Sequence, residues 1–259
     1  MEENQGQKRI ALLVDAENTQ HEKLVLVLEE ISAYGTIITK RAYGDWTASV
    51  LKKWPETLNR LAIQPIQQFS YTKGKNSSDS ALIIDAMDLL YTKKFDTFVI
   101  VSSDSDFTRL VTRLRDDEIF VIGVGEEKTP ESLVKACNDF IYLENLDADD
   151  ADDEGAKGRD TQAMSRKERE KRFNADKRKI VANLRRAAEK LGDDEGWTEV
   201  SLAGDLLKRQ DSAFNSRNYG FASLVKLIEA LNKTFEIARS PGKGKSLIIE
   251  YRVIPKNVS

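Results

Sequence analysis

The chain has one cysteine, Cys137, and one histidine, His21, among its 259 residues. A single cysteine excludes an internal disulfide and a cysteine-based zinc site, and it fits a protein of the reducing cytoplasm. His21 falls early in an expected helix with no second histidine to pair with it, so we interpret it as a surface or capping residue. No Ser-His-Asp or Cys-His set can therefore be assembled, which excludes the usual nucleophilic hydrolases.

Long apolar runs and phosphate-binding glycine motifs are also missing from the sequence. It has no run of about 18 apolar residues and no signal-peptide pattern, so we expect a soluble protein that is not exported. The GxxxxGK(S/T) and GxGxxG patterns, which cradle phosphates in nucleotide-binding proteins, do not occur. Metal-assisted chemistry remains, in which a cation polarises a phosphoryl oxygen and activates water.

The 40 basic and 43 acidic residues are unevenly distributed along the chain. Residues 1–146 hold 17 Lys/Arg and 23 Asp/Glu, and residues 147–154 hold six acidic residues and no basic one. Residues 155–259 hold 23 Lys/Arg and 14 Asp/Glu, a net charge of +9. A basic half points to a polyanionic partner, and the alternative is a solvated charged surface.

Apolar, β-branched runs alternate with helical patterns through the first 146 residues. Such runs predict parallel strands with both faces covered. We expect strands at residues 10–15, 36–43, 62–68, 98–101, 119–123 and 140–143. We expect helices at residues 24–35, from 47 with an interruption at Pro55, at 78–91, after residue 104 and at 131–136. Alternating strands and helices predict an α/β domain at residues 1–146, with a parallel sheet flanked by helices.

The second half has a different organisation. Residues 147–162 are charged and small and lack apolar periodicity, which predicts an acidic flexible linker. A basic helix begins at Ser165 and stops at Gly192, after which we expect helices at residues 198–209 and 224–231 and strands at 234–238 and 247–253. Three helices and a hairpin predict a small winged-helix domain at residues 163–259.

Carboxylates follow two of the expected strands. Asp15 ends the first, and Asp104 and Asp106 come shortly after the strand at residues 98–101. Neighbouring strands lie about 4.8 Å apart, and open α/β sheets bind ligands at their carboxyl ends. Carboxylates this close repel unless a proton or cation intervenes, and oxygen ligands suit Mg²⁺ or Mn²⁺. The simpler alternative is helix capping by Asp104 and Asp106.

Other polar residues fall near these strand ends. Ser102 or Ser103 could cap the helix that follows, and Asn18 could bind metal or phosphate or cap the first helix. Asp79 lies in a first helical turn, where a capping carboxylate is common. Asp85 is surrounded by apolar residues of its helix, so it should reach a partner or the site.

Three segments of the first half together resemble the NYN domain, the LabA-like branch of the PIN-like nucleases, over residues 8–146. They are Val14-Asp15-Ala16-Glu17-Asn18, then Lys73-Gly74-Lys75 with Asp79 and Asp85, and Ser102-Ser103-Asp104-Ser105-Asp106-Phe107. Residues 214–237, and above all Tyr219-Gly220-Phe221-Ala222-Ser223-Leu224, resemble the OST-HTH or LOTUS winged helix that is found with NYN domains.

The resemblance implies a PIN-like fold and a Mg²⁺- or Mn²⁺-dependent endoribonuclease. The implied catalytic and metal-binding positions are Asp15, Asp79, Asp104 and Asp106. In PIN-like relatives a glutamate often completes the site, and which residue would do so here stays open. The resemblance also implies an RNA-binding accessory domain and, because the sheets of PIN-like proteins often pair, a homodimer.

Basic residues are candidates for contacts with RNA phosphates. They lie in the polar loop around Lys73 and Lys75, in the basic helix, and in the expected hairpin loop. The alternative for the basic helix is a solvated surface with i,i+4 ion pairs. The candidate substrate-binding residues are Asn18, Lys73, Lys75, Asp85, Arg178, Lys243 and Lys245.

The leading hypothesis is a ribonuclease whose acidic domain cuts RNA and whose basic domain holds it. A non-catalytic RNA-binding adaptor is the first alternative, although the presence of all four aspartates favours the enzyme. A Toprim-type site also has a strand followed by Asp-x-Asp, but it would need a glutamate where this chain has Asp15. We therefore rank the Toprim interpretation last.

Overall fold

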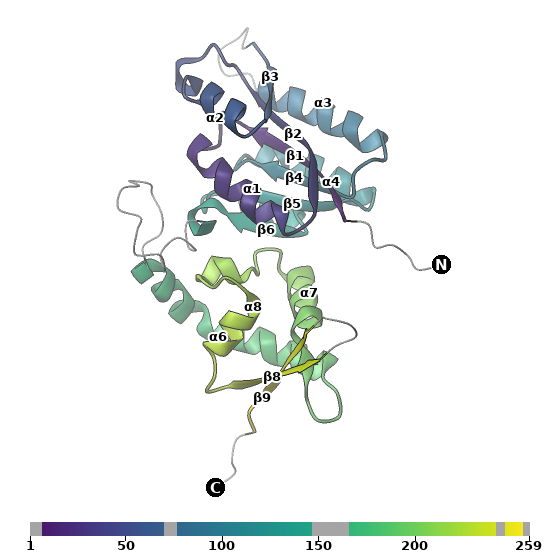
Figure 1. The fold of residues 1–259 in the computed structure, drawn as a ribbon, viewed down its shortest axis with the longest axis vertical. Coiled ribbons are helices and arrows are strands. Elements are labelled where there is room, and N and C mark those ends of the chain that lie inside the picture. Colours follow the sequence, from purple (N-terminus) through teal and green to yellow (C-terminus); the bar gives the residue numbers. More distant parts are fainter. Residues whose placement is uncertain (1–6, 70–76, 147–165, 242–246, 256–259) are drawn as a thin grey trace. The chain divides into compact units, whose positions relative to one another are not determined.

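The computed structural model describes residues 7–69, 77–146, 166–241 and 247–255 (Figure 1). The chain forms two compact units, residues 1–146 and 147–259. Four candidate lysines lie outside the described residues, as does the expected linker at 147–162. These lysines are Lys73, Lys75, Lys243 and Lys245.

The first unit is built on a six-stranded sheet in the order β3-β2-β1-β4-β5-β6, with every pair of neighbours parallel. The strands are β1 Arg9–Asp15, β2 Thr36–Gly44, β3 Gln64–Gln67, β4 Thr97–Val101, β5 Phe120–Gly125 and β6 Asp139–Tyr142. Every residue of β4 is buried, as expected for a central parallel strand. The predicted α/β fold with a parallel sheet is confirmed.

Helices cover both faces of this sheet (Figure 1). One face packs against α1 (Leu24–Ser32) and α2 (Trp54–Arg60), and the other carries α3 (Ser77–Tyr91), α4 (Thr108–Asp116) and α5 (Glu131–Ala136). Side chains alternate along a strand. In β1, Ile10, Leu12 and Val14 therefore join the core under α1 and α2, and Asp15 belongs to the face that α3 covers.

Two details of the first unit differ from expectation. Pro55 does not interrupt a helix, because it lies in the first turn of α2, where a missing N–H costs nothing. A 3₁₀ turn, η2 (Ser49–Leu51), precedes that helix. The helix after β4 begins with another 3₁₀ turn, η3 (Ser105–Phe107), and its cap is Asp104 instead of Ser102 or Ser103.

The second unit combines helices with a three-stranded antiparallel sheet in the order β7-β9-β8. Its elements are α6 Arg166–Leu191, β7 Thr198–Glu199, α7 Val200–Gln210, η5 Ser216–Tyr219, α8 Leu224–Glu229, β8 Phe235–Pro241 and β9 Leu247–Val253. Ile180 and Leu184 of α6 share a core with Leu227 and Tyr251, and the Tyr251 hydroxyl donates to the Leu184 carbonyl. The arrangement is consistent with the predicted winged helix.

The helix α7 begins two residues later than the sequence predicts. Thr198 and Glu199 were expected to open the helix, but they pair with β9 as the short strand β7. Their pairing with Tyr251 and Glu250 depends on residues some fifty positions later in the chain, so the local pattern does not predict it. Among the described residues, no helix has the length and apolar character needed to cross a membrane.

Candidate metal centre

Polar side chains gather where β1 and β4 end. The chain runs from β1 through β2 to β3 on one side of the sheet, and from β4 through β5 to β6 on the other. The strand order therefore reverses between β1 and β4, and open α/β sheets bind ligands outside the carboxyl ends of strands at such a point. Val14 pairs with Val101, so Asp15 and Ser102 are the next residues on the two strands.

Asp15 is buried at this edge and accepts three hydrogen bonds through its side chain. Ser102 Oγ donates to Oδ2 at 2.7 Å, Asn18 Nδ2 to Oδ2 at 2.9 Å, and the Glu17 N–H to Oδ1 at 3.2 Å. Burial raises the pKa of Asp15, and the hydrogen bonds from Ser102 and Asn18 oppose that rise. These donors fix the orientation of the carboxylate.

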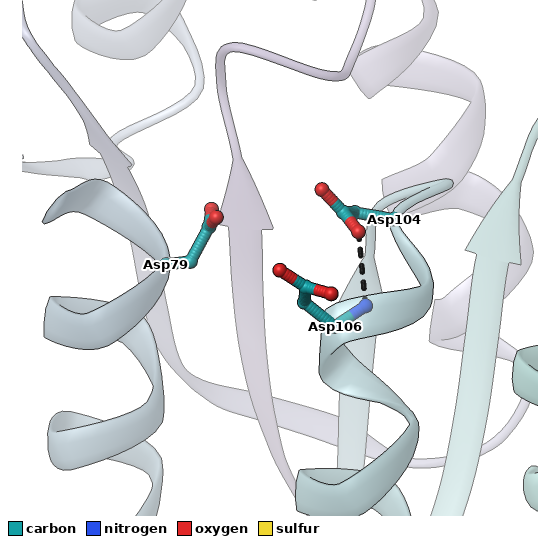
Figure 2. A group of neighbouring side chains, drawn as sticks. All are labelled: Asp79, Asp104 and Asp106. Atoms are coloured by element: carbon teal, nitrogen blue, oxygen red, sulfur yellow. Dashed lines mark hydrogen bonds between the residues drawn. The ribbon is translucent and has the colours of Figure 1, made fainter. Parts of the chain in front are cut away.

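Asp79, Asp104 and Asp106 form an acidic trio at the same edge (Figure 2). One carboxylate oxygen from each lies within 4.8 Å of those from the other two. Asp79 belongs to the first turn of α3, and Asp104 and Asp106 belong to the cap and first turn of η3. Asp79 thus lies beside Asp104 and Asp106. We call these three residues the acidic trio.

Asp104 both caps the 3₁₀ turn η3 and belongs to the acidic trio. Its Oδ1 accepts from the Asp106 N–H at 2.9 Å, which is the capping role considered from the sequence. The Asp104 N–H in turn donates to Ser102 Oγ at 3.1 Å. Ser102 therefore connects Asp104 to Asp15, because its hydroxyl also donates to the Asp15 carboxylate.

Negative charge accumulates around Asp79, which is only 6% exposed. Its pKa is raised to about 7, first by burial and then by the charges of four carboxylates. These are, in decreasing order of effect, Asp15, Asp104, Glu17 and Asp106. A cation placed among these groups would relieve the repulsion that a proton on Asp79 otherwise relieves.

The donors of the acidic trio suit a hard divalent cation. Carboxylate oxygens are the ligands that Mg²⁺ prefers, at about 2.1 Å, so two ligands of one ion lie up to about 4.2 Å apart. The spacing within 4.8 Å is close to this range. Asp15 is not one of the three residues of the acidic trio, but its negative charge helps to raise the pKa of Asp79.

The polar contacts of Asn18 and Asp85 lie within the first unit. Asn18 does not cap a helix, because η1 (His21–Lys23) is preceded by Gln20 and the Asn18 amide donates to Asp15. Asp85 was expected to bind substrate or a partner, and both of its oxygens are held inside the protein by Arg41 and Tyr43. Asp85 thus has the partner that its apolar surroundings require, and its assignment to substrate binding stays a prediction.

The sequence alone did not predict a role in the centre for two side chains, Ser102 and Glu17. Ser102 follows β4 on the face that carries Asp15, and strand alternation could have revealed it. Glu17, two residues after Asp15, accepts from Ser78 Oγ at 3.1 Å and so reaches the first turn of α3. Glu17 is the glutamate nearest in sequence to Asp15, and its negative charge contributes to the raised pKa of Asp79.

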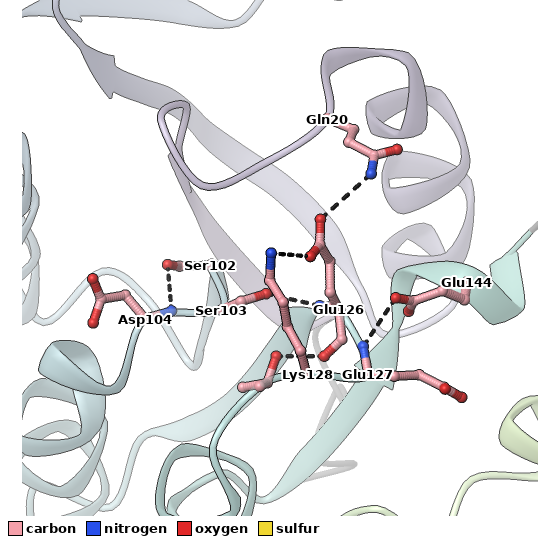
Figure 3. Close-up of polar contacts among 9 residues, drawn as sticks. Gln20, Ser102, Ser103, Asp104, Glu126, Glu127, Lys128 and Glu144 are labelled. Carbon is pink, nitrogen blue, oxygen red and sulfur yellow. Dashed lines mark hydrogen bonds and ion pairs between the residues drawn. The ribbon is translucent and has the colours of Figure 1, made fainter. Parts of the chain in front are cut away.

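The turn after β5 is hydrogen-bonded to the segment that follows β4 (Figure 3). The Glu126 N–H donates to Ser103 Oγ at 2.8 Å, and the Glu127 N–H donates to Glu144 Oε1 at 3.0 Å. The Glu126 carboxylate accepts from Gln20 Nε2 at 3.4 Å and pairs with Lys128 Nζ at 2.6 Å. The bond to Ser103 stabilises the segment that carries Ser102, Ser103 and Asp104, and the other contacts hold the turn itself.

The remaining candidates lie elsewhere. Arg178 is exposed on α6 of the second unit. His21 contacts Thr57 and Glu22 and packs near Trp54, as a structural residue would.

Comparisons with known proteins match both halves of the chain. The NYN domain model matches residues 9–144, and the OST-HTH/LOTUS domain model matches residues 171–247. An uncharacterized protein of Methanocaldococcus jannaschii is 26% identical over 140 residues, which are 52% of this chain and 55% of that protein. This chain thus spans about half the length of that relative. A crystal structure of a protein of unknown function from Vibrio parahaemolyticus has 17% identity and a TM-score of 0.46, and the match covers 54% of this chain and 95% of that one.

Proposed function

This chain belongs to the NYN domain family, and from that premise we propose that it is a metal-dependent ribonuclease that hydrolyses RNA phosphodiester bonds. A NYN domain has a PIN-like nuclease fold, and here an OST-HTH/LOTUS domain follows it, so the pair supports a nuclease or RNA-binding role. The observation that carries the proposal is the acidic trio, which lies at the carboxyl edge of the sheet within reach of one cation.

The acidic trio would hold Mg²⁺ or Mn²⁺, with Asp15 as a further negative charge beside it. A bound cation of this kind supplies charge stabilisation at a phosphoryl oxygen and a more acidic water. Ser102 and Asn18 orient the Asp15 carboxylate, and Ser102 also holds the Asp104 backbone. Asp79, whose pKa is raised to about 7 without a cation, would release its proton when the cation binds.

RNA would be held by basic residues in both halves. Arg178 is exposed and available for phosphate contacts, and Lys73, Lys75, Lys243 and Lys245 remain predictions outside the described residues. Asn18, exposed beside Asp15, is a further proposed contact to substrate. A homodimer and a cytoplasmic location also stay predictions.

Cleavage of labelled single-stranded RNA by the full chain tests the proposal. We expect cutting with Mn²⁺ or Mg²⁺, none with EDTA, and its loss in Asp104→Asn and Asp106→Asn, while RNA binding is retained. Asp88→Asn is the matched control, because Asp88 is an exposed aspartate on α3. Binding without cutting, on several RNAs and with every metal, would favour the non-catalytic adaptor. Cutting that survives in both variants would place the activity elsewhere.

A further inference from the structure

Two side chains of β2 hold one carboxylate of α3. Arg41 Nη1 donates to Asp85 Oδ1, and the Tyr43 hydroxyl donates to Asp85 Oδ2. Arg41 and Tyr43 are two residues apart on a strand, so they point to the same face, the one that α3 covers. We call Arg41, Tyr43 and Asp85 the α3 clamp.

The α3 clamp is built beside the metal centre. Tyr43 pairs with Asp15 across β1 and β2, and its carbonyl accepts from the Ala16 N–H at 3.0 Å. The Tyr43 side chain is fully buried, and burial together with the Asp85 hydrogen bond raises its pKa, so the hydroxyl remains a proton donor at neutral pH. The side chains of Arg41 and Asp85 are only 26% and 22% exposed, so water competes weakly for this ion pair.

The same helix carries Asp79 to the acidic trio. Asp85 follows Asp79 by six residues, a rise of about 9 Å along a rigid helix. A shift of α3 along its axis would therefore move both carboxylates by the same amount. Leu82, Ala86 and Leu89 bury the helix, and the α3 clamp adds directional bonds to this apolar packing, which is itself not directional.

Repulsion makes this restraint necessary. One oxygen of Asp79 lies within 4.8 Å of those of Asp104 and Asp106, so ionised carboxylates push the first turn of α3 away from the centre when no cation is bound. Hydrogen bonds to charged groups are directional and stronger than neutral ones, so the α3 clamp opposes this push. Metal sites need their ligands within about 0.2 Å of the proper distances, a tolerance that a sliding helix would exceed.

We infer that Asp85 is a positioning residue, which Arg41 and Tyr43 hold so that α3 presents Asp79 to the cation. The α3 clamp thus sets the affinity of the acidic trio for Mg²⁺ or Mn²⁺ without touching the ion. This inference rests on the metal centre of the proposed function.

Mn²⁺ binding by the full chain, without RNA, tests the inference. Free Mn²⁺ is followed by electron paramagnetic resonance for the wild type, Asp85→Asn and Tyr43→Phe, and each thermal midpoint is measured. We expect Asp85→Asn and Tyr43→Phe each to weaken Mn²⁺ binding by up to about 10-fold, because α3 loses one hydrogen bond to a charged group, which is worth about tenfold in an equilibrium constant. Tyr43→Phe removes one hydroxyl and keeps the ion pair, so it decides the question alone if Asp85→Asn does not fold.

Asp96→Asn is the matched control. Asp96 is also held by an arginine, since it accepts from Arg9 N at 2.8 Å and Arg9 Nε at 3.1 Å, but it lies at the opposite edge of the sheet, before β4. We expect this variant to lose stability and keep the wild-type affinity for Mn²⁺. The inference is overturned if folded Tyr43→Phe and Asp85→Asn bind Mn²⁺ as the wild type does. A wild type that binds no Mn²⁺ would overturn the metal centre itself.

Discussion

Replacing Asp79 by asparagine should stabilise the protein when no metal is present. The pKa of Asp79 is raised from its ordinary 3.8 to about 7 by burial and by the neighbouring carboxylates. A difference of about three pKa units at about 1.36 kcal/mol each gives a ceiling of about 4 kcal/mol for the cost of ionising Asp79 in the folded protein. Neighbours such as Asp106, which is exposed, can turn toward water, so we expect a gain of about 1–3 kcal/mol.

The sign of this effect depends on pH in a defined way. A carboxyl group whose pKa is raised by folding destabilises the folded state once it is ionised, so the cost is complete above pH 7. As the pH falls below 7, the folded protein binds a proton at Asp79 before the unfolded chain does, and the cost shrinks. The advantage of Asp79→Asn should therefore be full at pH 8 and less than half as large near pH 5.

Urea unfolding in EDTA measures this advantage. Trp46 and Trp54 belong to the first unit, so a Trp197→Phe background makes fluorescence report on that unit alone. Asp88→Asn, which removes an exposed aspartate from the same helix, is the control and should change little. Saturating Mn²⁺ should reverse the order and favour the wild type, because only the carboxylate binds the cation. No gain at pH 8, or an equal gain at pH 5, would refute the reasoning.

Three further outcomes follow from the same geometry. Mn²⁺ affinity should rise as the pH increases from 6 to 8, with proton release detectable by calorimetry in buffers of different ionisation enthalpy, because the cation displaces the proton of Asp79. Ser102→Ala should weaken Mn²⁺ binding about 10-fold in a titration, because the Ser102 hydroxyl accepts from the Asp104 N–H at 3.1 Å and so positions a residue of the acidic trio. Gly125→Ala should lower stability to urea by about 1–3 kcal/mol, because its Cβ would lie 2.7 Å from Thr129 Oγ1 and 2.8 Å from the Ser102 carbonyl oxygen.

Much of the first unit could be predicted because its strands are local signals. Buried parallel strands appear as continuous apolar runs, and β4, with five buried residues, is the clearest case. A carboxylate directly after such a run lies at the carboxyl edge wherever the strand falls in the sheet. That regularity explains why Asp15 and Asp104 could be assigned to one edge before their strands were known to pair.

The contacts of Asp85 could not be predicted, because they depend on how α3 packs on β2. Arg41 and Tyr43 lie 44 and 42 positions away in sequence, and no periodicity connects them to Asp85. The apolar surroundings of Asp85 showed only that it needed a partner. The short strand β7 escaped for the same reason, since its partner β9 comes some fifty residues later.

The raised pKa of Asp79 and the α3 clamp are both consequences of bringing several carboxylates together. A centre that binds a divalent cation tightly must bring carboxylates together, and without the cation these groups push their helices apart. Apolar packing under α3 is not directional, so the directional part of the restraint comes from the bonds between Asp85 and β2. Asp79→Asn should therefore raise the stability of the metal-free protein, whereas Tyr43→Phe should lower it, although both substitutions weaken metal binding. Opposite effects on stability with the same effect on affinity would separate a ligand from the residues that position it.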